Sequence, residues 1–287
     1  MKRVLTFIKD VLKGIVVGLA NVVPGVSGGT MMVAMGIYDK LISAISHLFS
    51  KMKEHFFFLL AILIGMAIAI LGGSVLITNL FDRFPFPTTL FFIGLILGSL
   101  PMIWAKVKGE KKKPGHFIAF AIFFALVIGM ALLSNITGHT ADLTPNFKNM
   151  AILFLVGLVA AGTMVIPGVS GSLVLLVLGY YDPVLSTVKG FIEAIKNKDM
   201  AALGDCVKIL LPFGIGVLLG IVLLAKLIEW IFKKFETTAY WAILGLIVAS
   251  PIGIIMMSSF GALTAGPVIA GVVCLIIGGS IAFNLSK

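Results

Sequence analysis

Two short stretches decide the fold that this sequence predicts, "NVVPGVSGGTMMVAMGIYDKL" (Asn21–Leu41) and "MVIPGVSGSLVLLVLGYYDPVL" (Met164–Leu185). Each lies in a long apolar run and interrupts it with a proline, glycines and a serine. Moved by 143 positions, the first aligns with the second through Pro24/Pro167, Gly25/Gly168, Val26/Val169, Ser27/Ser170, Gly28/Gly171, Gly36/Gly179 and Asp39/Asp182. The match indicates a duplicated unit.

The composition is typical of a protein embedded in a membrane. Of its 287 residues, 60% are hydrophobic and 12% are charged, and the mean hydropathy is +1.15. A soluble domain carries about 25% charged residues and about 45–50% apolar ones. Several apolar blocks exceed the roughly 18 residues that argue for a membrane span. We therefore expect an all-α polytopic membrane protein.

Eight apolar blocks pair in order and predict two repeats, at residues 1–143 and 144–287. Each repeat begins with a broken block, which we expect to form a re-entrant hairpin. The first hairpin is expected around 14–37, and three transmembrane helices follow it at about 56–80, 88–104 and 117–133. The second is expected around 150–180, and three more helices follow it at about 207–228, 238–257 and 265–284. Gly65 matches Gly216 at an offset of 151, and "GLILGSLP" (Gly94–Pro101) is similar to "GLIVASP" (Gly245–Pro251).

The positions of the positive charges favour this re-entrant arrangement. With cytoplasmic termini and hairpins that return to the side they left, 16 of the 22 lysine and arginine residues fall on the cytoplasmic side. If all eight blocks crossed the membrane, only 10 of these residues would lie on the cytoplasmic side. Cytoplasmic loops normally carry the excess of lysine and arginine. Three crossings per repeat is an odd number, so the repeats are predicted to have inverted topology, as in many transporters with midplane binding sites.

The two breaks also predict an anion site. Proline ends the incoming half-helix, glycine permits a reversal, and the outgoing half-helix begins with free N–H groups and the positive end of its dipole. Such helix starts bind phosphate. The candidate phosphate-binding residues are Pro24, Gly25, Ser27, Gly28, Gly29, Thr30, Pro167, Gly168, Ser170, Gly171 and Ser172. The alternative is that these small residues only allow close helix packing.

Five further polar residues have two interpretations each. Arg83, in "FDRFPF", pairs either with a phosphate or with Asp82 or a lipid headgroup. Asp39 and Asp182 each cap the next helix or bind a coupling ion. Asn21 and Thr163 precede the breaks, where they either face the cavity or form hydrogen bonds inside their helices.

Several classes of function are excluded. The net charge is +10, but the lysines lie between apolar blocks and not along a basic face, so we expect no nucleic-acid partner. Cys206 and Cys274 provide no disulfide framework, and the four histidines lack metal-ligand spacing, so we expect neither metal nor cofactor. Lys9, Asp10 and Lys13 interrupt the first apolar segment, which indicates a retained N-terminus and not a cleaved signal peptide.

The chain resembles the PopT-type polyprenyl-phosphate transporter family, once classed as a domain of unknown function. The resemblance rests on "PGVSGGT" with "MGIYDKL" and on "PGVSGS" with "LGYYDPVL", and it covers nearly the whole chain in length and block order. It implies a flippase, not an enzyme, that moves undecaprenyl phosphate (a C55 polyprenyl phosphate) across the bacterial cytoplasmic membrane for lipid-carrier recycling in cell-envelope and peptidoglycan synthesis. It implies a headgroup role for Pro24, Gly25, Ser27, Gly28, Gly29, Pro167, Gly168, Ser170 and Gly171.

The implied partners are the polyprenyl phosphate, membrane lipids and a coupling ion. An anion that moves inward works against an inside-negative potential, at about 2.3 kcal/mol per charge per 100 mV. Cotransport of protons or sodium is therefore expected. The sequence leaves the coupling ion, the exact lipid, the direction of transport and the oligomeric state open.

Two alternative functions remain. Undecaprenyl-pyrophosphate phosphatases have similar re-entrant halves, but their Pro-Gly-x-Ser loop continues with an arginine and works with intramembrane glutamates. Here Gly28 and Gly171 occupy the arginine position, and the apolar blocks have no acidic residue in their interior, so the groups that ester hydrolysis needs are missing. The other alternative is a transporter or channel for a small soluble anion.

Overall fold

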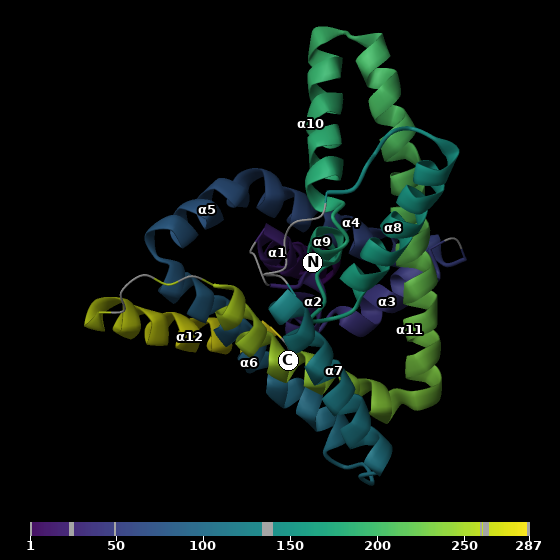
Figure 1. The fold of residues 1–287 in the computed structure, drawn as a ribbon. Coiled ribbons are helices and arrows are strands. Elements are labelled where there is room, and N and C mark those ends of the chain that lie inside the picture. Colours follow the sequence, from purple (N-terminus) through teal and green to yellow (C-terminus); the bar gives the residue numbers. More distant parts are fainter. Residues whose placement is uncertain are drawn as a thin grey trace.

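The computed structural model describes residues 2–22, 26–48, 50–133, 140–258, 260 and 264–285, and all regular structure in this part of the chain is helical (Figure 1). Six of the described helices are long and apolar enough to cross a membrane, or seven if the bent pair Gly171–Val177 and Tyr181–Asn197 forms one broken span. The prediction of an all-α, multi-pass membrane protein is confirmed.

The helices of residues 1–143 include two short ones after the first break. They are α1 (Lys2–Val22), α2 (Gly28–Ala34), α3 (Tyr38–Ser46), α4 (Met52–Ile68), the π-helix η1 (Ala69–Gly73), α5 (Ser74–Arg83), α6 (Pro85–Val107) and α7 (Pro114–Leu133). The helices of residues 144–287 are α8 (Phe147–Val165), α9 (Gly171–Val177), α10 (Tyr181–Asn197), α11 (Met200–Met257) and α12 (Ala265–Leu285).

The order and the bounds of the elements recur between the two parts of the chain. Helices α2 and α9 both have seven residues and begin 143 positions apart. The backbone of Phe84, between α5 and α6, has φ −135° and ψ 57°. Phe235, 151 positions later, has φ −137° and ψ 44° and kinks α11. Helix starts and non-helical residues therefore recur at the same offsets as the sequence matches. The inversion of the repeats across the membrane stays a prediction.

The predicted blocks map onto the helices with some differences in continuity. The block at 14–37 becomes α1 and α2, and the block at 150–180 becomes α8 and α9. The predicted spans at 207–228 and 238–257 are two arms of α11, which Figure 1 shows turning near its middle. The predicted span at 56–80 covers most of α4, all of η1 and most of α5.

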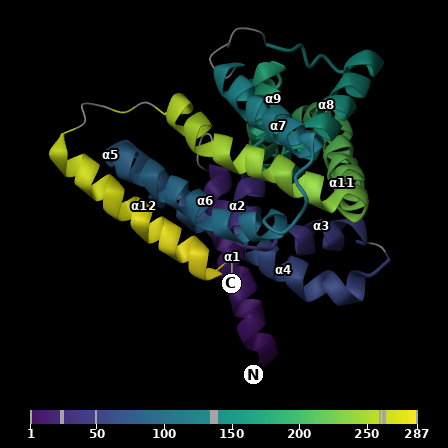
Figure 2. The ribbon, with the colours of Figure 1, turned by 90° about the horizontal axis from the view of Figure 1, so that it is seen from below.

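Helices from the two parts of the chain pack against one another. Helix α6 lies along α12, and α7 lies along the second arm of α11 (Figures 1 and 2). Glycines permit this close approach: a Cβ atom at Gly94 would overlap the carbonyl oxygen of Leu275, and one at Gly245 would overlap that of Phe120. Each part therefore completes the packing of the other.

A second pair of close contacts joins α1 to α4 and α8 to α11. A Cβ atom at Gly65 would overlap the carbonyl oxygen of Val11, and one at Gly216 would overlap that of Phe154. We expect Gly216→Ala to force the two helices apart and to destabilise the protein by about 1–3 kcal/mol. The loss should appear as a lower melting temperature in detergent, followed by fluorescence-detected gel filtration.

Gly129→Ala, in α7, is the control for that substitution. A Cβ atom there meets nothing within 4 Å. Because alanine favours a helix by about 1 kcal/mol over glycine, we expect unchanged or raised stability. Equal melting temperatures for Gly216→Ala and the unaltered protein would contradict the close contact.

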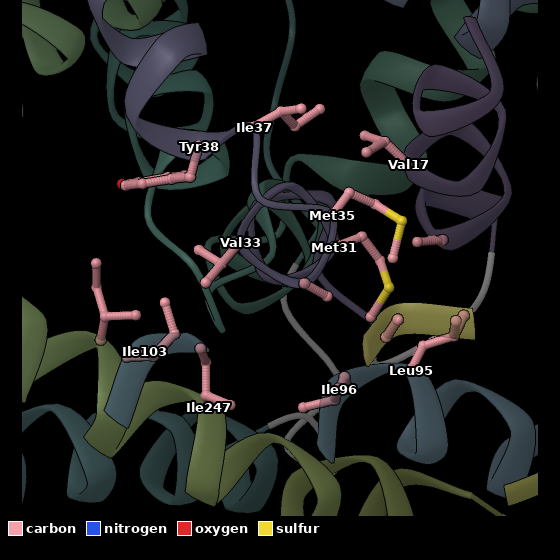
Figure 3. Packing of buried hydrophobic residues seen from close by; sticks show 14 of the residues in the cluster. Val17, Met31, Val33, Met35, Ile37, Tyr38, Leu95, Ile96, Ile103 and Ile247 are labelled. Atoms are coloured by element: carbon pink, nitrogen blue, oxygen red, sulfur yellow. The ribbon is translucent and has the colours of Figure 1, made fainter. Parts of the chain in front are cut away.

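Helix α2 lies at the centre of the apolar core. Figure 3 shows Met31, Val33 and Met35 pointing outward from it, with Ile103 of α6 and Ile247 of α11 nearby. Six of its seven residues are buried, namely Gly28, Gly29, Thr30, Met31, Val33 and Ala34. In its counterpart α9 only Gly171 and Leu173 are buried. The two short helices thus have equivalent positions in the chain but unequal surroundings.

Candidate functional site

The two breaks meet inside the protein. The Ser27 hydroxyl donates a hydrogen bond to the carbonyl oxygen of Val169 over 3.0 Å, and the N–H of Gly168 donates one to the Thr30 hydroxyl over 2.6 Å. A Cβ atom at Gly29 would lie only 3.1 Å from the carbonyl oxygen of Ile166. Segments about half a chain apart are therefore joined directly, at the starts of α2 and α9.

Both short helices begin at a serine that leaves its own helix uncapped. Ser27 and Ser170 are the N-cap residues of α2 and α9 and have extended backbones, with φ −89° and ψ 130° and with φ −106° and ψ 123°. Neither side chain accepts a hydrogen bond from its helix. The N–H groups of a first helical turn have no intrahelical acceptor. These amides are thus left to partners outside their helices.

A cavity of about 800 Å³ lies beside the joined breaks. Both short segments contribute to its wall, through Val26, Ser27, Gly28, Gly168, Val169, Ser170, Gly171 and Ser172. The hydroxyls of Ser170 and Ser172 lie 2.7 Å apart, and Ser172 is exposed. Asn21, from the end of α1, also lines the cavity, and its amide donates to the carbonyl oxygen of Val17. Most of the polar residues that line the cavity therefore lie at the breaks.

Apart from Tyr181 and Ser250, the rest of the cavity wall is apolar. On one side it comes from α4 and η1, and on another from α11, with Leu59, Leu63, Met66, Ile70, Leu218, Ile221 and Val222. Ile70 and Ile221 are counterparts at the offset of 151. No charged residue is among the described residues that line this cavity. An anion at its polar end is therefore held by dipoles and hydroxyls.

Other predicted site residues lie nearby or elsewhere. Thr30 and Pro167 are buried behind the cavity wall, and Gly29 contacts the second break. The Thr163 hydroxyl donates to the carbonyl oxygen of Ala160 inside α8, which is the helix-interior interpretation. Arg83 is exposed at the end of α5 and does not line the cavity. The predicted residues Pro24 and Gly25 fall outside the described part of the chain.

Neither of the two aspartates that were candidates for helix capping occupies an N-cap position. Asp39 and Asp182 lie in the first turns of α3 and α10, whose N-cap residues are Ile37 and Tyr180. Asp39 accepts a hydrogen bond from the hydroxyl of Tyr240 over 2.7 Å. Asp182 is exposed. The N-cap interpretation is wrong for both residues, because each helix begins before its aspartate.

The sequence analysis missed Tyr240 and the apolar walls formed by α4 and α11. The walls follow only from the folded arrangement, since their residues are the ordinary aliphatic residues of membrane spans. Tyr240 is one of four tyrosines in the chain, and this scarcity was the one available signal. Among the described residues, no group of three or more His, Cys, Asp and Glu side chains lies close enough together to hold a metal ion.

Comparison with known proteins relates the chain to one family. Residues 17–266 match a protein family described as undecaprenyl phosphate translocase-like. The chain is 31% identical over 245 residues to a polyprenyl-phosphate transporter of Staphylococcus aureus, covering 84% of this chain and 83% of that protein. It is 29% identical over 266 residues to a polyprenyl-phosphate transporter of Vibrio cholerae, covering 86% and 77%. No solved structure matches.

Proposed function

The chain belongs to the undecaprenyl phosphate translocase-like family, and we propose from this that it carries a polyprenyl phosphate across a bacterial cytoplasmic membrane. The observation that carries the proposal is the cavity beside Ser27 and Ser170, with a polar end and long apolar walls. A polyprenyl phosphate matches this distribution of polar and apolar surface, because it has a charged phosphate at one end of a long hydrocarbon chain. The names of both relatives support this choice of substrate.

The headgroup is proposed to lie against the two breaks. The Ser170 and Ser172 hydroxyls face the cavity as a pair, and the first-turn amides of α2 and α9 lie beside them. Hydroxyl and amide donors of this kind bind phosphate oxygens. Asn21 supplies a further polar side chain at the same end. Arg83, at the end of α5, is proposed to meet the headgroup before it enters.

The isoprenoid tail is proposed to lie between α4 with η1 and the first arm of α11. Ile70 and Ile221 face the cavity from these two walls, and the outer residues Leu63 and Leu218 are 62% and 67% exposed. In a membrane protein, such exposed aliphatic residues contact lipid. A tail can therefore leave the cavity sideways and stay in the bilayer while the headgroup crosses. The cavity of about 800 Å³ holds only the first isoprenoid units of a C55 chain.

A cation is proposed to accompany the headgroup. The described residues around the cavity provide no charge, and burial of an unpaired anion is costly. Inward movement also works against the membrane potential, at about 2.3 kcal/mol per charge per 100 mV. A proton on the phosphate, or a bound proton or sodium ion, lowers both costs. The proposed transport direction is toward the cytoplasmic leaflet, where the carrier is reused in cell-envelope synthesis.

Reconstitution of the purified protein tests the proposal. Labelled undecaprenyl phosphate is placed in both leaflets of a vesicle, and a phosphatase that cannot cross the membrane is added outside. Cleavage that stops near half in protein-free vesicles should run nearly to completion when the protein is present. Cleavage that stops near half with the protein present as well would contradict the proposal.

The same vesicles separate the alternatives. Phosphate released from labelled undecaprenyl pyrophosphate without added phosphatase would indicate a hydrolase. Uptake of inorganic phosphate without movement of the lipid would indicate a small-anion transporter or channel. Either result would replace the function proposed above.

A bulky residue in the tail groove should obstruct the lipid. We expect Ile221→Trp to lower the initial translocation rate of undecaprenyl phosphate about tenfold, because the ring fills space that one isoprenoid unit occupies. A water-soluble short-chain prenyl phosphate should still bind at the breaks, as measured by calorimetry. Leu227→Trp, on an exposed part of α11 outside the cavity, is the matched control and should translocate normally. An equal loss in both variants would argue against a tail site at Ile221.

A further inference from the structure

Helix α2 also borders, through Val33, a second, smaller cavity. Its volume is about 170 Å³, and its walls come from α2, α3, α6 and the second arm of α11. The lining residues are Val33, Gly36, Tyr38, Asp39, Met102, Ile103, Lys106, Tyr240 and Ile243. Unlike the large cavity, it contains charged residues of both signs, Asp39 and Lys106.

The small cavity corresponds to one end of the large one. Four of its lining positions have counterparts, at the offsets of 143 and 151, that line the large cavity. These pairs are Val33/Leu176, Tyr38/Tyr181, Met102/Gly253 and Lys106/Met257. The same parts of the two repeats thus surround a wide space on one side of the breaks and a narrow one on the other.

Two hydrogen bonds and an aromatic cluster hold the narrow space closed. The Tyr240 hydroxyl donates to Asp39 over 2.7 Å, and the Tyr38 hydroxyl donates to the carbonyl oxygen of Val165 over 3.0 Å. The ring of Phe232 lies 6.2 Å from that of Tyr38 and 5.2 Å from that of Tyr240. These contacts join α3 of the first repeat to α8 and α11 of the second. Tyr38 is only 4% exposed.

The corresponding contacts are absent at the wide end, as far as the described residues show. Tyr181 and Asp182, the counterparts of Tyr38 and Asp39, are both exposed. Thr89, the counterpart of Tyr240, is 1% exposed, and its hydroxyl has no hydrogen-bond partner among the described residues. Helix α2 is likewise enclosed, whereas most residues of α9 are partly or fully exposed. Equivalent residues therefore form a closed end in one repeat and an open end in the other.

We propose that the small cavity is the closed second entrance to the headgroup site, and that the Tyr240–Asp39 hydrogen bond is the latch that keeps it closed. The inference rests on the proposed function, because it takes the phosphate headgroup as the molecule that passes. The headgroup enters through the wide end and reaches the breaks. The latch then opens while the wide end closes around Tyr181 and Asp182. Lys106 Nζ, 5.3 Å from the centre of the Tyr240 ring, faces the phosphate once the latch is open.

Cysteine accessibility tests the latch without any substrate. In a chain with Cys206→Ala and Cys274→Ala, single reporters are placed at Ile103→Cys in the small cavity and at Met257→Cys in the large one. A water-soluble thiol reagent is added to the full-length protein in detergent or in open membrane sheets, and the labelling rates are measured with and without Tyr240→Phe. Loss of one hydrogen bond is expected to change the balance between the two states about fivefold.

The expected pattern is reciprocal. Tyr240→Phe should raise labelling at the Ile103→Cys reporter about fivefold and lower it at the Met257→Cys reporter. Ser99→Cys, on α6 but fully buried away from both cavities, should stay unlabelled. Equal increases at all three reporters would show a merely structural hydrogen bond and overturn the latch, and unchanged labelling at Ile103→Cys would also overturn it.

A cross-link gives an independent test. In the same Cys206→Ala and Cys274→Ala chain, Asp39→Cys and Tyr240→Cys are joined by a short bis-methanethiosulfonate reagent, which forms a disulfide with each thiol and releases sulfinate. Translocation should then stop, and reduction of the two disulfides should restore it. Full translocation in the cross-linked protein would overturn the latch. The accessibility test reports on the latch alone, so a reciprocal pattern in a protein that moves no polyprenyl phosphate would contradict the proposed function and leave the latch in place.

Discussion

A chain that carries both Ser27→Ala and Ser170→Ala is expected to lose translocation of undecaprenyl phosphate by about 100-fold or more. Hydrogen bonds to a charged group contribute about 1.5–3 kcal/mol each, and each 1.4 kcal/mol is a factor of ten. Ser170 faces the cavity, where its hydroxyl can donate to the headgroup. Ser27 donates to Val169 and so also holds the two breaks together. The double substitution therefore removes both a ligand contact and the support of the site.

The measurement is the initial rate of phosphatase-accessible headgroup appearance in vesicles with equal amounts of protein. Ser170→Thr keeps the hydroxyl and should retain most of the rate. Ser258→Ala is the matched control, because that hydroxyl donates to Ile254 in its own helix and lies outside the cavity. A folded double variant with an unchanged rate would remove Ser27 and Ser170 from the site.

The breaks themselves were predictable because proline and glycine act locally. The sequence predicts an outgoing half-helix directly after each proline–glycine break, and α2 and α9 begin at Gly28 and Gly171. The repeat offsets could be seen in the sequence for the same reason, since each break keeps its residues. Whether these residues bind phosphate stays a prediction.

The contacts between the breaks were not predictable in the same way. The Ser27–Val169 hydrogen bond joins residues 142 positions apart, and the Tyr240–Asp39 bond joins residues 201 positions apart. A single sequence gives no measure of which distant polar groups meet. Asp39 therefore allowed two interpretations, as a helix cap or as an ion ligand, and neither indicated its hydrogen bond with Tyr240. Whether Asp39 binds an ion stays a prediction.

The kink in α11 was hidden for a different reason. Phe235 is an ordinary apolar residue, and the charged segment around it looked like a loop between two spans. In the structure, helix continues on both sides of this one non-helical residue. The helix-breaking signals of proline and glycine are missing at the kink, so only tertiary packing can place it. The π-helix Ala69–Gly73 likewise had only its paired glycines as a local sign.

Gly168→Ala is expected to reduce translocation about tenfold or more, because two costs add at one position. Gly168 has φ +76°, a left-handed conformation that costs other residues about 1–2 kcal/mol. The new Cβ atom would also lie 3.0 Å from Val127 Cγ2 and 3.2 Å from Leu246 Cβ. The segment must shift away from α7 and α11, which disturbs the Gly168 N–H bond to Thr30, and loss of this partly buried hydrogen bond costs about 1 kcal/mol.

Two further variants separate backbone strain from the loss of the contact between the breaks. Gly179→Ala imposes the same left-handed strain, at φ +78°, at the far end of α9 and away from the cavity wall. It should lower the melting temperature while each folded molecule translocates normally. Thr30→Val removes the acceptor for Gly168 without backbone strain, and should share the translocation loss of Gly168→Ala. If Gly168→Ala and Gly179→Ala lost translocation equally and Thr30→Val lost none, strain alone would explain the effect, and the joined breaks would have no part in carrying the headgroup.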